Sequence, residues 1–322
     1  MRTLADPGLY LRTEECLRFL RGLPAAAAPA PASPDPREIH HLYWQGAFGR
    51  KQAFAVKSFL ATQHPAGSEL WLWLDADSGY AEHAPNPLLR PLLPFLRVRA
   101  FDPRVEARDT PLEPHLYLSG DADPVARSNF FRFLILYRYG GTYADMDVMF
   151  LRDLRDLHRW LADAGLSDEF CYRWAGHPWA NTAVLRLRRS GDTARALLRR
   201  CIEIGSCRPR QVLDLAAELP PDLTILPSTF FDPLWLHVDR QDRWVDAPFQ
   251  RFHDFFRPPG WRIAWRRRVP SLREFAPGAF TYHWHNGWAE PERRGSPFAC
   301  FEREFDALVR ARQPLDAPAG WR

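Results

Sequence analysis

The sequence predicts an α/β fold in which a mostly parallel sheet carries helices on both faces. Three observations predict it. Short apolar segments rich in aromatic residues alternate with segments of helical periodicity between residues 38 and 150. The chain has 322 residues with 46% hydrophobic content, which is enough for a sizeable core. A strong helical pattern at residues 124–139 runs directly into a glycine pair and a further strand pattern.

Each element follows from its local pattern. Apolar runs predict strands at residues 38–44, 68–75, 95–101, 142–151 and 181–189. Apolar residues at helical spacing predict helices at residues 13–21, 50–63, 124–139, 193–204 and 296–312. We expect Thr13 to be the N-cap of the first helix and Gly140 to follow the end of the third. Frequent Pro and Trp predict many loops between residues 220 and 300.

The composition predicts one folded unit behind an N-terminal appendage. Residues 22–36 are rich in Pro and Ala and predict an extended linker. We therefore expect a division into residues 1–36, with a helix and the linker, and residues 37–322, with the folded domain.

Charge and cysteine content exclude some classes of protein. The formal net charge of +4 requires no nucleic acid or other polyanion as a partner. The five cysteines show no metal-ligand spacing and suggest reduced thiols in a cytoplasmic protein. We see no signal peptide and no uninterrupted apolar stretch of about 18 residues. Abundant Arg, Ala and Pro with only two lysines is typical of a GC-rich bacterial genome.

Residues 261–273 interleave Trp with Arg. We interpret this segment as a solvated loop, and the alternative is a patch that contacts an anionic surface. A peripheral contact with the inner membrane therefore stays open.

The most informative stretch is "YRYGGTYADMDVMFL" at residues 137–151. Asp145 and Asp147 are two positions apart on a predicted strand, so both side chains are expected to face the same way. Two carboxylates this close repel each other unless a cation or a proton joins them. Their oxygen atoms suit Mg²⁺ or Mn²⁺, with positions left for phosphate oxygens. The alternative is an exposed acidic pair on an edge strand.

The segment 128–151 resembles the sugar-binding region of the DXD-containing glycosyltransferases. That family includes yeast initiating mannosyltransferases, α1,4-galactosyltransferases and bacterial polysaccharide glycosyltransferases. The matching residues are Ser128, Arg132, Gly140, Gly141, Tyr143, Asp145 and Asp147. The sequence departs from the family at Asn129, where Asp is usual. The resemblance implies that this position contacts the ribose and sugar of the donor, where Asn can still donate and accept hydrogen bonds.

Three further places are similar to the same family. Trp44, at the end of the first strand, matches a Trp that stacks on the nucleotide base, and its alternative is a core position. His283, Asn286 and Trp288 in "YHWHNGW" match a closing segment that reaches the metal and the diphosphate, with His285 as the competing ligand. Asn181 matches a residue of the sugar or acceptor pocket, and its alternative is a turn Asn.

The resemblance implies a GT-A type nucleotide-sugar-binding fold, which is Rossmann-like. It implies a metal-dependent, retaining hexosyltransferase that moves a sugar from a UDP- or GDP-sugar to a hydroxyl acceptor in polysaccharide synthesis. Asp145, Asp147 and His283 would hold Mn²⁺ or Mg²⁺, and Arg132 would supply a fixed positive charge. The implied donor-binding set is Trp44, Ser128, Asn129, Arg132, Gly141, Tyr143, Asn181, Asn286 and Trp288.

Two other functions fit the paired acids. A non-catalytic sugar-binding protein would keep the pocket without needing the metal ligands. An aspartate-dependent phosphotransferase would use Asp145 as nucleophile, but it needs a downstream Lys, and the last Lys is Lys57.

Overall fold

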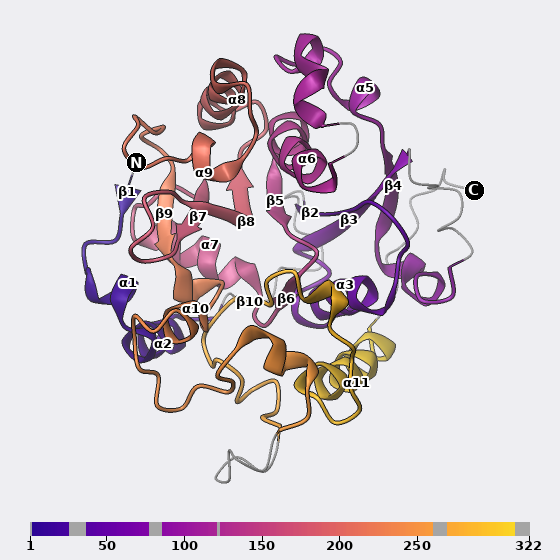
Figure 1. The fold of residues 1–322 in the computed structure, drawn as a ribbon, viewed down its shortest axis with the longest axis vertical. Helices are drawn as coiled ribbons and strands as arrows, with labels where there is room; N and C mark the ends of the chain where they lie inside the picture. Colours follow the sequence, from indigo (N-terminus) through magenta and orange to yellow (C-terminus); the bar gives the residue numbers. More distant parts are fainter. Residues whose placement is uncertain (1, 26–36, 77–85, 121–122, 260–268, 313–322) are drawn as a thin grey trace.

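A computed structural model gives the fold for residues 2–25, 37–76, 86–120, 123–259 and 269–312 (Figure 1). Within these described residues, eight strands form one sheet in the order β1-β9-β7-β8-β5-β2-β3-β4. The strands are β1 Arg2–Thr3, β2 Glu38–Trp44, β3 Ser68–Asp75, β4 Arg97–Phe101, β5 Gly141–Ala144, β7 Phe170–Arg173, β8 Asn181–Leu187 and β9 Thr224–Pro227. All neighbours are parallel except β8, which is antiparallel to both β5 and β7. The predicted α/β class with a mostly parallel sheet is confirmed.

Helices cover both faces of the sheet, as the sequence predicts (Figure 1). One face packs on α2 Thr13–Arg21, α3 Arg50–Thr62, α7 Leu154–Asp163 and α11 Pro297–Arg310. The other face packs on α5 Pro103–Glu106, α6 Pro124–Tyr139, α8 Asp192–Ile204 and α9 Pro209–Val212. The shorter elements are α1 Gly8–Leu11, α10 Trp235–Val238, η2 Arg90–Phe95, η3 Glu113–Ser119, η4 Ser228–Phe230, η5 Phe252–Phe256 and η6 Gly287–Ala289.

Most element boundaries agree with the sequence to within about two residues. The predicted bounds of α2, α6, β2 and β3 are confirmed, and Gly140 follows α6 with φ of 69° as expected. The expected N-cap at Thr13 is wrong. The first residue before α2 is Arg12, and the backbone N–H of Thr13 instead donates to the Asp242 carboxylate at 2.6 Å. A distant loop therefore caps this helix.

The described N-terminal residues pack onto the same core as the sheet. β1 pairs with β9, and Cys16, Leu17 and Leu20 of α2 are buried. The linker expected at residues 22–36 lies largely outside the described residues, so the division at residue 36 stays a prediction.

A second, two-stranded sheet brings the C-terminal part of the chain to the middle of the fold. β6 Val148–Phe150 pairs antiparallel with β10 Thr281–His283. The register places His283 opposite Val148. Because Asp147 immediately precedes β6, this pairing sets an imidazole beside the acidic pair.

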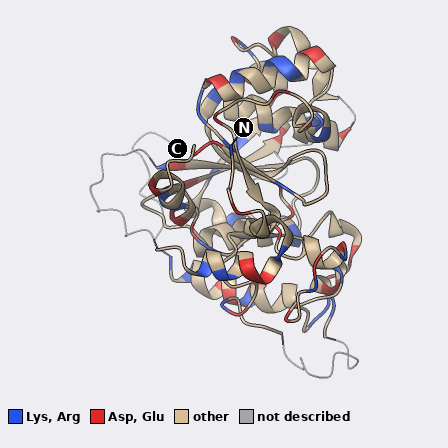
Figure 2. Cartoon of the chain, turned by 90° about the vertical axis from the view of Figure 1, so that its left-hand side faces the viewer, with Lys and Arg blue, Asp and Glu red and all other residues tan. Residues whose placement is uncertain are grey.

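Positions of acidic and basic residues are interspersed along the helices in the view of Figure 2. Among the described helices, none has the length and apolar character that a membrane crossing requires. Most of the basic segment 261–273, on which the expected surface contact depends, lies outside the described residues.

One buried histidine beneath the glycine pair predicts acid sensitivity. The Nε2–H of His41 donates to the Gly140 carbonyl at 2.9 Å, and the Trp73 indole donates to its Nδ1 at 3.1 Å. Burial lowers the pKa of His41 to about 4, although the bond to Gly140 partly opposes this. The pKa of His41 is lower in the folded than in the unfolded chain. The stability that neutral His41 contributes is therefore complete above about pH 6.5 and is lost as the pH falls toward 4.

We expect His41→Gln to flatten the pH dependence of stability, measured by urea unfolding at pH 7.5 and pH 5. Between pH 7.5 and pH 5, the free energy of unfolding of the wild type should fall by about 2 kcal/mol more than that of the variant. His115→Gln, at a half-exposed position, is the control. Equal losses in the wild type and His41→Gln would contradict the assignment.

Candidate active site

A cavity of about 800 Å³ opens beyond the carboxyl ends of β2 and β5. Such sheets bind ligands at that edge. The cavity is lined by these residues of the predicted site: Trp44, Ser128, Asn129, Arg132, Tyr143, Asp145, Asp147, Asn181, His283, Asn286 and Trp288. The fold therefore brings together residues from segments that are widely separated in the chain.

Gly141 is the predicted site residue that does not line this cavity. Its φ is 96°, and a Cβ at this position would lie 2.2 Å from the carbonyl oxygen of Ile39. The glycine is needed because β2 and β5 approach each other closely here. Its backbone role explains the glycine, and its place in the donor-binding set stays a prediction.

The two aspartates lie in a turn, which corrects the prediction of one continuous strand over residues 142–151. β5 ends at Ala144 and β6 begins at Val148. The backbone N–H of Val148 donates to the Asp145 carbonyl at 3.1 Å and closes the turn. The chain leaves the large sheet here because β6 pairs with β10. The carboxylates converge through this turn and not through the two-residue repeat of a strand.

Asp145 is held by α6 and β5. Its Oδ1 accepts hydrogen bonds from the Arg132 guanidinium at 2.8 Å and from the Tyr143 hydroxyl at 2.6 Å. Ser128 Oγ lies 3.0 Å from the same hydroxyl. Arg132 is buried and also donates to the Thr182 hydroxyl at 2.6 Å. Arg132 therefore fixes the orientation of Asp145 and supplies the positive charge expected beside the acidic pair.

Asp147 is held by the C-terminal segment. Its Oδ2 lies 3.2 Å from the His283 Nε2 and accepts the backbone N–H of Asn286 at 2.7 Å. The other ring nitrogen of His283 lies 3.3 Å from the Tyr172 hydroxyl. Burial alone would lower the pKa of His283, but the Asp147 carboxylate raises it to about 9. Burial alone would raise the pKa of Asp147, but the His283 imidazolium lowers it to about 2.

The ligand atoms of Asp145, Asp147 and His283 all lie within 4.8 Å of one another. Carboxylate oxygens suit Mg²⁺ and Mn²⁺, and imidazole is a common additional ligand of transition metals. The residues present therefore fit a divalent cation.

A neighbouring group among the described residues shares one of these ligands. Asp232, His283 and His285 also have ligand atoms within 4.8 Å of one another. The His285 ring stacks on the His283 ring with centroids 4.0 Å apart, and its Nε2–H donates to Asp232 at 2.8 Å. His285 is thus bound to a carboxylate of its own, whereas His283 faces the Asp-x-Asp turn.

Two tryptophans meet at one end of the cavity. The rings of Trp44 and Trp288 have centroids 4.7 Å apart and are tilted by 49°. The buried ammonium of Lys51 binds the carbonyl oxygens of Gly287 at 2.6 Å and of Trp288 at 2.9 Å. Lys51 thereby holds the segment that carries Trp288 in place. No sequence motif pointed to Lys51, because its partners are backbone carbonyls distant in the chain.

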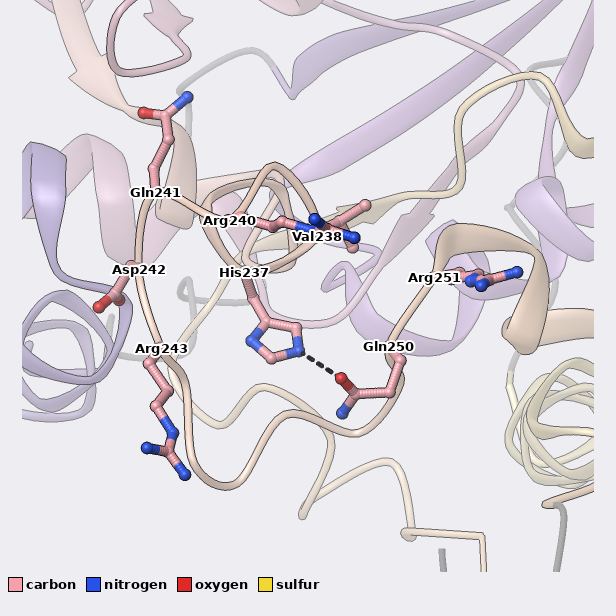
Figure 3. A pocket seen from close by; sticks show the side chains of 8 residues that line it. All are labelled: His237, Val238, Arg240, Gln241, Asp242, Arg243, Gln250 and Arg251. Atoms are coloured by element: carbon pink, nitrogen blue, oxygen red, sulfur yellow. Dashed lines mark hydrogen bonds between the residues drawn. The ribbon is translucent and has the colours of Figure 1, made fainter. Parts of the chain in front are cut away.

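A separate cavity of about 550 Å³ contains none of the predicted site residues (Figure 3). It is lined by His237, Val238, Arg240, Gln241, Asp242, Arg243, Gln250 and Arg251. His237 and Gln250 are hydrogen-bonded across it at 3.2 Å. In Figure 3 the side chain of Arg243 extends downward and that of Arg251 extends to the right, away from each other. The arginines therefore do not converge on one point, and this cavity is not the site predicted from the sequence.

Comparison with known proteins agrees with the resemblance seen in the sequence. Residues 113–165 match the family model described as "Glycosyltransferase sugar-binding region containing DXD motif". No curated protein matches the sequence. The match covers α6, the glycine pair and the Asp-x-Asp turn, which are the elements that build one side of the cavity.

Several solved glycosyltransferases are similar at low identity. PaToxG glycosyltransferase has 12% identity and a TM-score of 0.42, with 70% of this chain and 76% of that chain covered. Glycosyltransferase GlyE of Streptococcus pneumoniae TIGR4 has 12% identity and a TM-score of 0.47, with 86% and 63% covered. Galactosyltransferase LgtC in complex with donor and acceptor sugar analogs has 16% identity and a TM-score of 0.42, with 88% and 98% covered.

The matched segment lies at the cavity and indicates the class of the protein. Residues 113–165 are similar to the DXD-containing sugar-binding region of glycosyltransferases, and this match supports a glycosyltransferase. The α/β fold with a large, mostly parallel sheet agrees with the predicted fold class.

Proposed function

We propose that the protein transfers a sugar from a nucleoside diphosphate sugar to a hydroxyl acceptor with the help of Mn²⁺ or Mg²⁺. The observation that carries the proposal is the convergence of Asp145, Asp147 and His283 within 4.8 Å on the wall of the cavity. These ligands come from a turn and from β10, so the complete set exists only in the folded chain. The cation, when bound, supplies positive charge that stabilises the departing diphosphate.

The residues of this chain bind and orient the donor in the proposed arrangement. Trp44 stacks on the nucleotide base, and Trp288 covers the phosphates together with Asn286. The amide of Asn129 is buried at the cavity wall and makes no side-chain hydrogen bond within the described residues, so its polar atoms are available to the sugar or ribose.

The remaining donor contacts come from groups that are already ordered. Ser128 and Tyr143 form a hydroxyl pair at 3.0 Å beside Asp145. The side-chain Oδ1 of Asn181 accepts a hydrogen bond from the Ala183 backbone N–H at 2.6 Å. This bond leaves the side-chain NH₂ group of Asn181 for a ligand. Arg132 holds Asp145 in position through its hydrogen bond. The proposal includes a UDP- or GDP-sugar as donor and retention of the anomeric configuration. It also includes a polysaccharide as product and a place at the inner face of a bacterial membrane.

A thermal-shift screen tests the donor side. UDP, GDP and their common sugar conjugates are added with Mn²⁺, with Mg²⁺ or with EDTA. We expect one nucleotide series to raise the melting temperature only when a divalent cation is present. A ligand at 100 times its dissociation constant stabilises the folded protein by about 2.7 kcal/mol. A shift of equal size in EDTA, or no shift with any nucleotide, would refute the proposed metal-dependent donor site.

A further inference from the structure

Two tryptophans and two arginines that line the cavity take no part in the proposed donor site. They are Trp174, Trp179, Arg208 and Arg210, and we call them the tryptophan–arginine wall. Both tryptophans are half-buried and both arginines are exposed. The family match ends at residue 165, so all four lie outside it. Their chemistry therefore needs an explanation of its own.

The backbone holds this wall together. Trp179 and Asp214 form an isolated antiparallel bridge, and the Ala180 N–H donates to the Leu213 carbonyl at 2.9 Å. These bonds tie the start of β8 to the segment that contains α9. In Figure 1, α9 lies on the β8 side of the sheet, whereas α3, which follows Trp44, lies on the β2 side. The wall is thus on the side of the cavity away from the proposed base site.

The tryptophans form a fixed aromatic surface. The Trp174 indole donates to the Asp232 carboxylate at 2.9 Å and stacks on Trp235 with centroids 4.0 Å apart. Trp179 packs edge-on against His177 at 4.9 Å. A rigid indole offers a large apolar face at a low entropic cost, which suits the C–H face of a sugar ring.

The arginines supply unopposed positive charge. Within the described part of the chain, neither Arg208 nor Arg210 forms an ion pair or a side-chain hydrogen bond, although both line the cavity. Other arginines of the chain are paired in the structure, as Arg186 is with Glu38 and Asp168. A guanidinium binds carboxylate and phosphate groups through two parallel hydrogen bonds. Two such groups at one cavity indicate an anionic ligand.

We propose that the tryptophan–arginine wall is the acceptor subsite and that the acceptor is a sugar with a negatively charged substituent, a carboxylate or a phosphate. This inference rests on the proposed glycosyl transfer and adds the class of acceptor to it. Trp174 and Trp179 pack against the sugar ring, while Arg208 and Arg210 bind the anionic substituent. A neutral sugar would leave the two guanidinium groups without a partner.

The test compares three sugars with the same ring. Methyl β-glucoside, methyl β-glucuronide and glucose 6-phosphate are titrated into the full-length protein at low salt, with and without Mn²⁺ and the nucleotide, and followed by ligand-observed NMR. We expect at least one anionic sugar to bind about tenfold more tightly than the neutral one, because a hydrogen bond to a charged group contributes about 1.5 kcal/mol or more. The two anionic sugars distinguish a carboxylate from a phosphate.

Variants assign the preference to the wall. Arg208→Gln with Arg210→Gln should remove the preference for the anionic sugar and leave the affinity for the nucleotide with Mn²⁺ unchanged. Trp179→Ala should weaken the binding of all three sugars. Arg199→Gln, an exposed position on α8 that does not line the cavity, is the matched control for a lost charge.

Two results would overturn the inference. One is equal binding of all three sugars to the wild type. The other is a double arginine variant that keeps its preference or loses nucleotide affinity instead. Failure of the proposed donor site would appear separately, as absent metal-dependent nucleotide binding, while the sugar preference can still be measured on the free protein.

Discussion

Asp147→Asn is expected to remove divalent-cation binding and to lower sugar transfer by at least about 100-fold. The Asp147 carboxylate faces His283 at 3.2 Å and is buried. Asn has the same shape and can still accept the Asn286 backbone N–H, so the turn should keep its fold. What the variant lacks is the negative charge that a cation needs at this point. Isothermal titration with Mn²⁺ measures the binding, and release of nucleotide from the donor measures the activity.

Asp232→Asn is the matched control for this prediction. Asp232 belongs to the neighbouring group with His285 and contributes no ligand to the Asp-x-Asp group. Both groups share His283, so a variant at His283 would not separate them. If Asp232→Asn lost Mn²⁺ binding while Asp147→Asn kept it, the cation site would be the neighbouring group and the proposed site would be wrong.

The sequence predicted the part of the site that is local in the chain. The pattern of a single helix–glycine–strand segment indicates its elements and its two aspartates, whereas Ser128, Arg132 and Tyr143 of the same segment were named through the family resemblance. His283 was reached through the family resemblance alone. No local pattern shows that β10 pairs with β6, because strand pairing across the chain depends on the tertiary fold.

The geometry of the aspartates shows a second limit of prediction from the sequence. Apolar residues continue through residues 142–151, so periodicity predicts one strand where the chain turns and changes sheets. The partners of Lys51 and of Thr13 could not be predicted from the sequence either. Lys51 binds backbone carbonyl groups, and the Thr13 N–H donates to a carboxylate, from loops distant in the chain. Helix and strand existence is a local property, whereas the choice of polar partners is a property of the folded chain.

The second large effect is expected at a buried ion pair beneath the cavity. Arg127 donates from Nε to the Asp75 carboxylate at 2.9 Å, and both side chains are almost fully buried. The Tyr43 hydroxyl donates to the same carboxylate at 2.5 Å. Arg127→Met would remove the guanidinium from this buried ion pair, and we expect the free energy of unfolding to fall by about 3–5 kcal/mol.

Two further variants make this prediction specific. Arg12→Met removes the exposed Arg12–Glu15 pair and should leave stability nearly unchanged. Adding Asp75→Asn to Arg127→Met removes the second charge of the buried pair and should restore part of the loss. Urea unfolding of the four proteins measures these differences. A cost for Arg127→Met no larger than that for Arg12→Met would contradict the prediction.

The same pair also positions the site. Arg127 lies in α6 directly before Ser128 and Asn129, and Asp75 ends β3. The pair therefore fixes the first turns of α6 against the sheet, at the edge where the cavity opens. We expect Arg127→Met to weaken donor binding at temperatures where the variant is still folded, because Ser128 and Arg132 orient Tyr143 and Asp145 from that helix. Unchanged nucleotide affinity in the folded variant would show that the pair stabilises the fold without positioning the site.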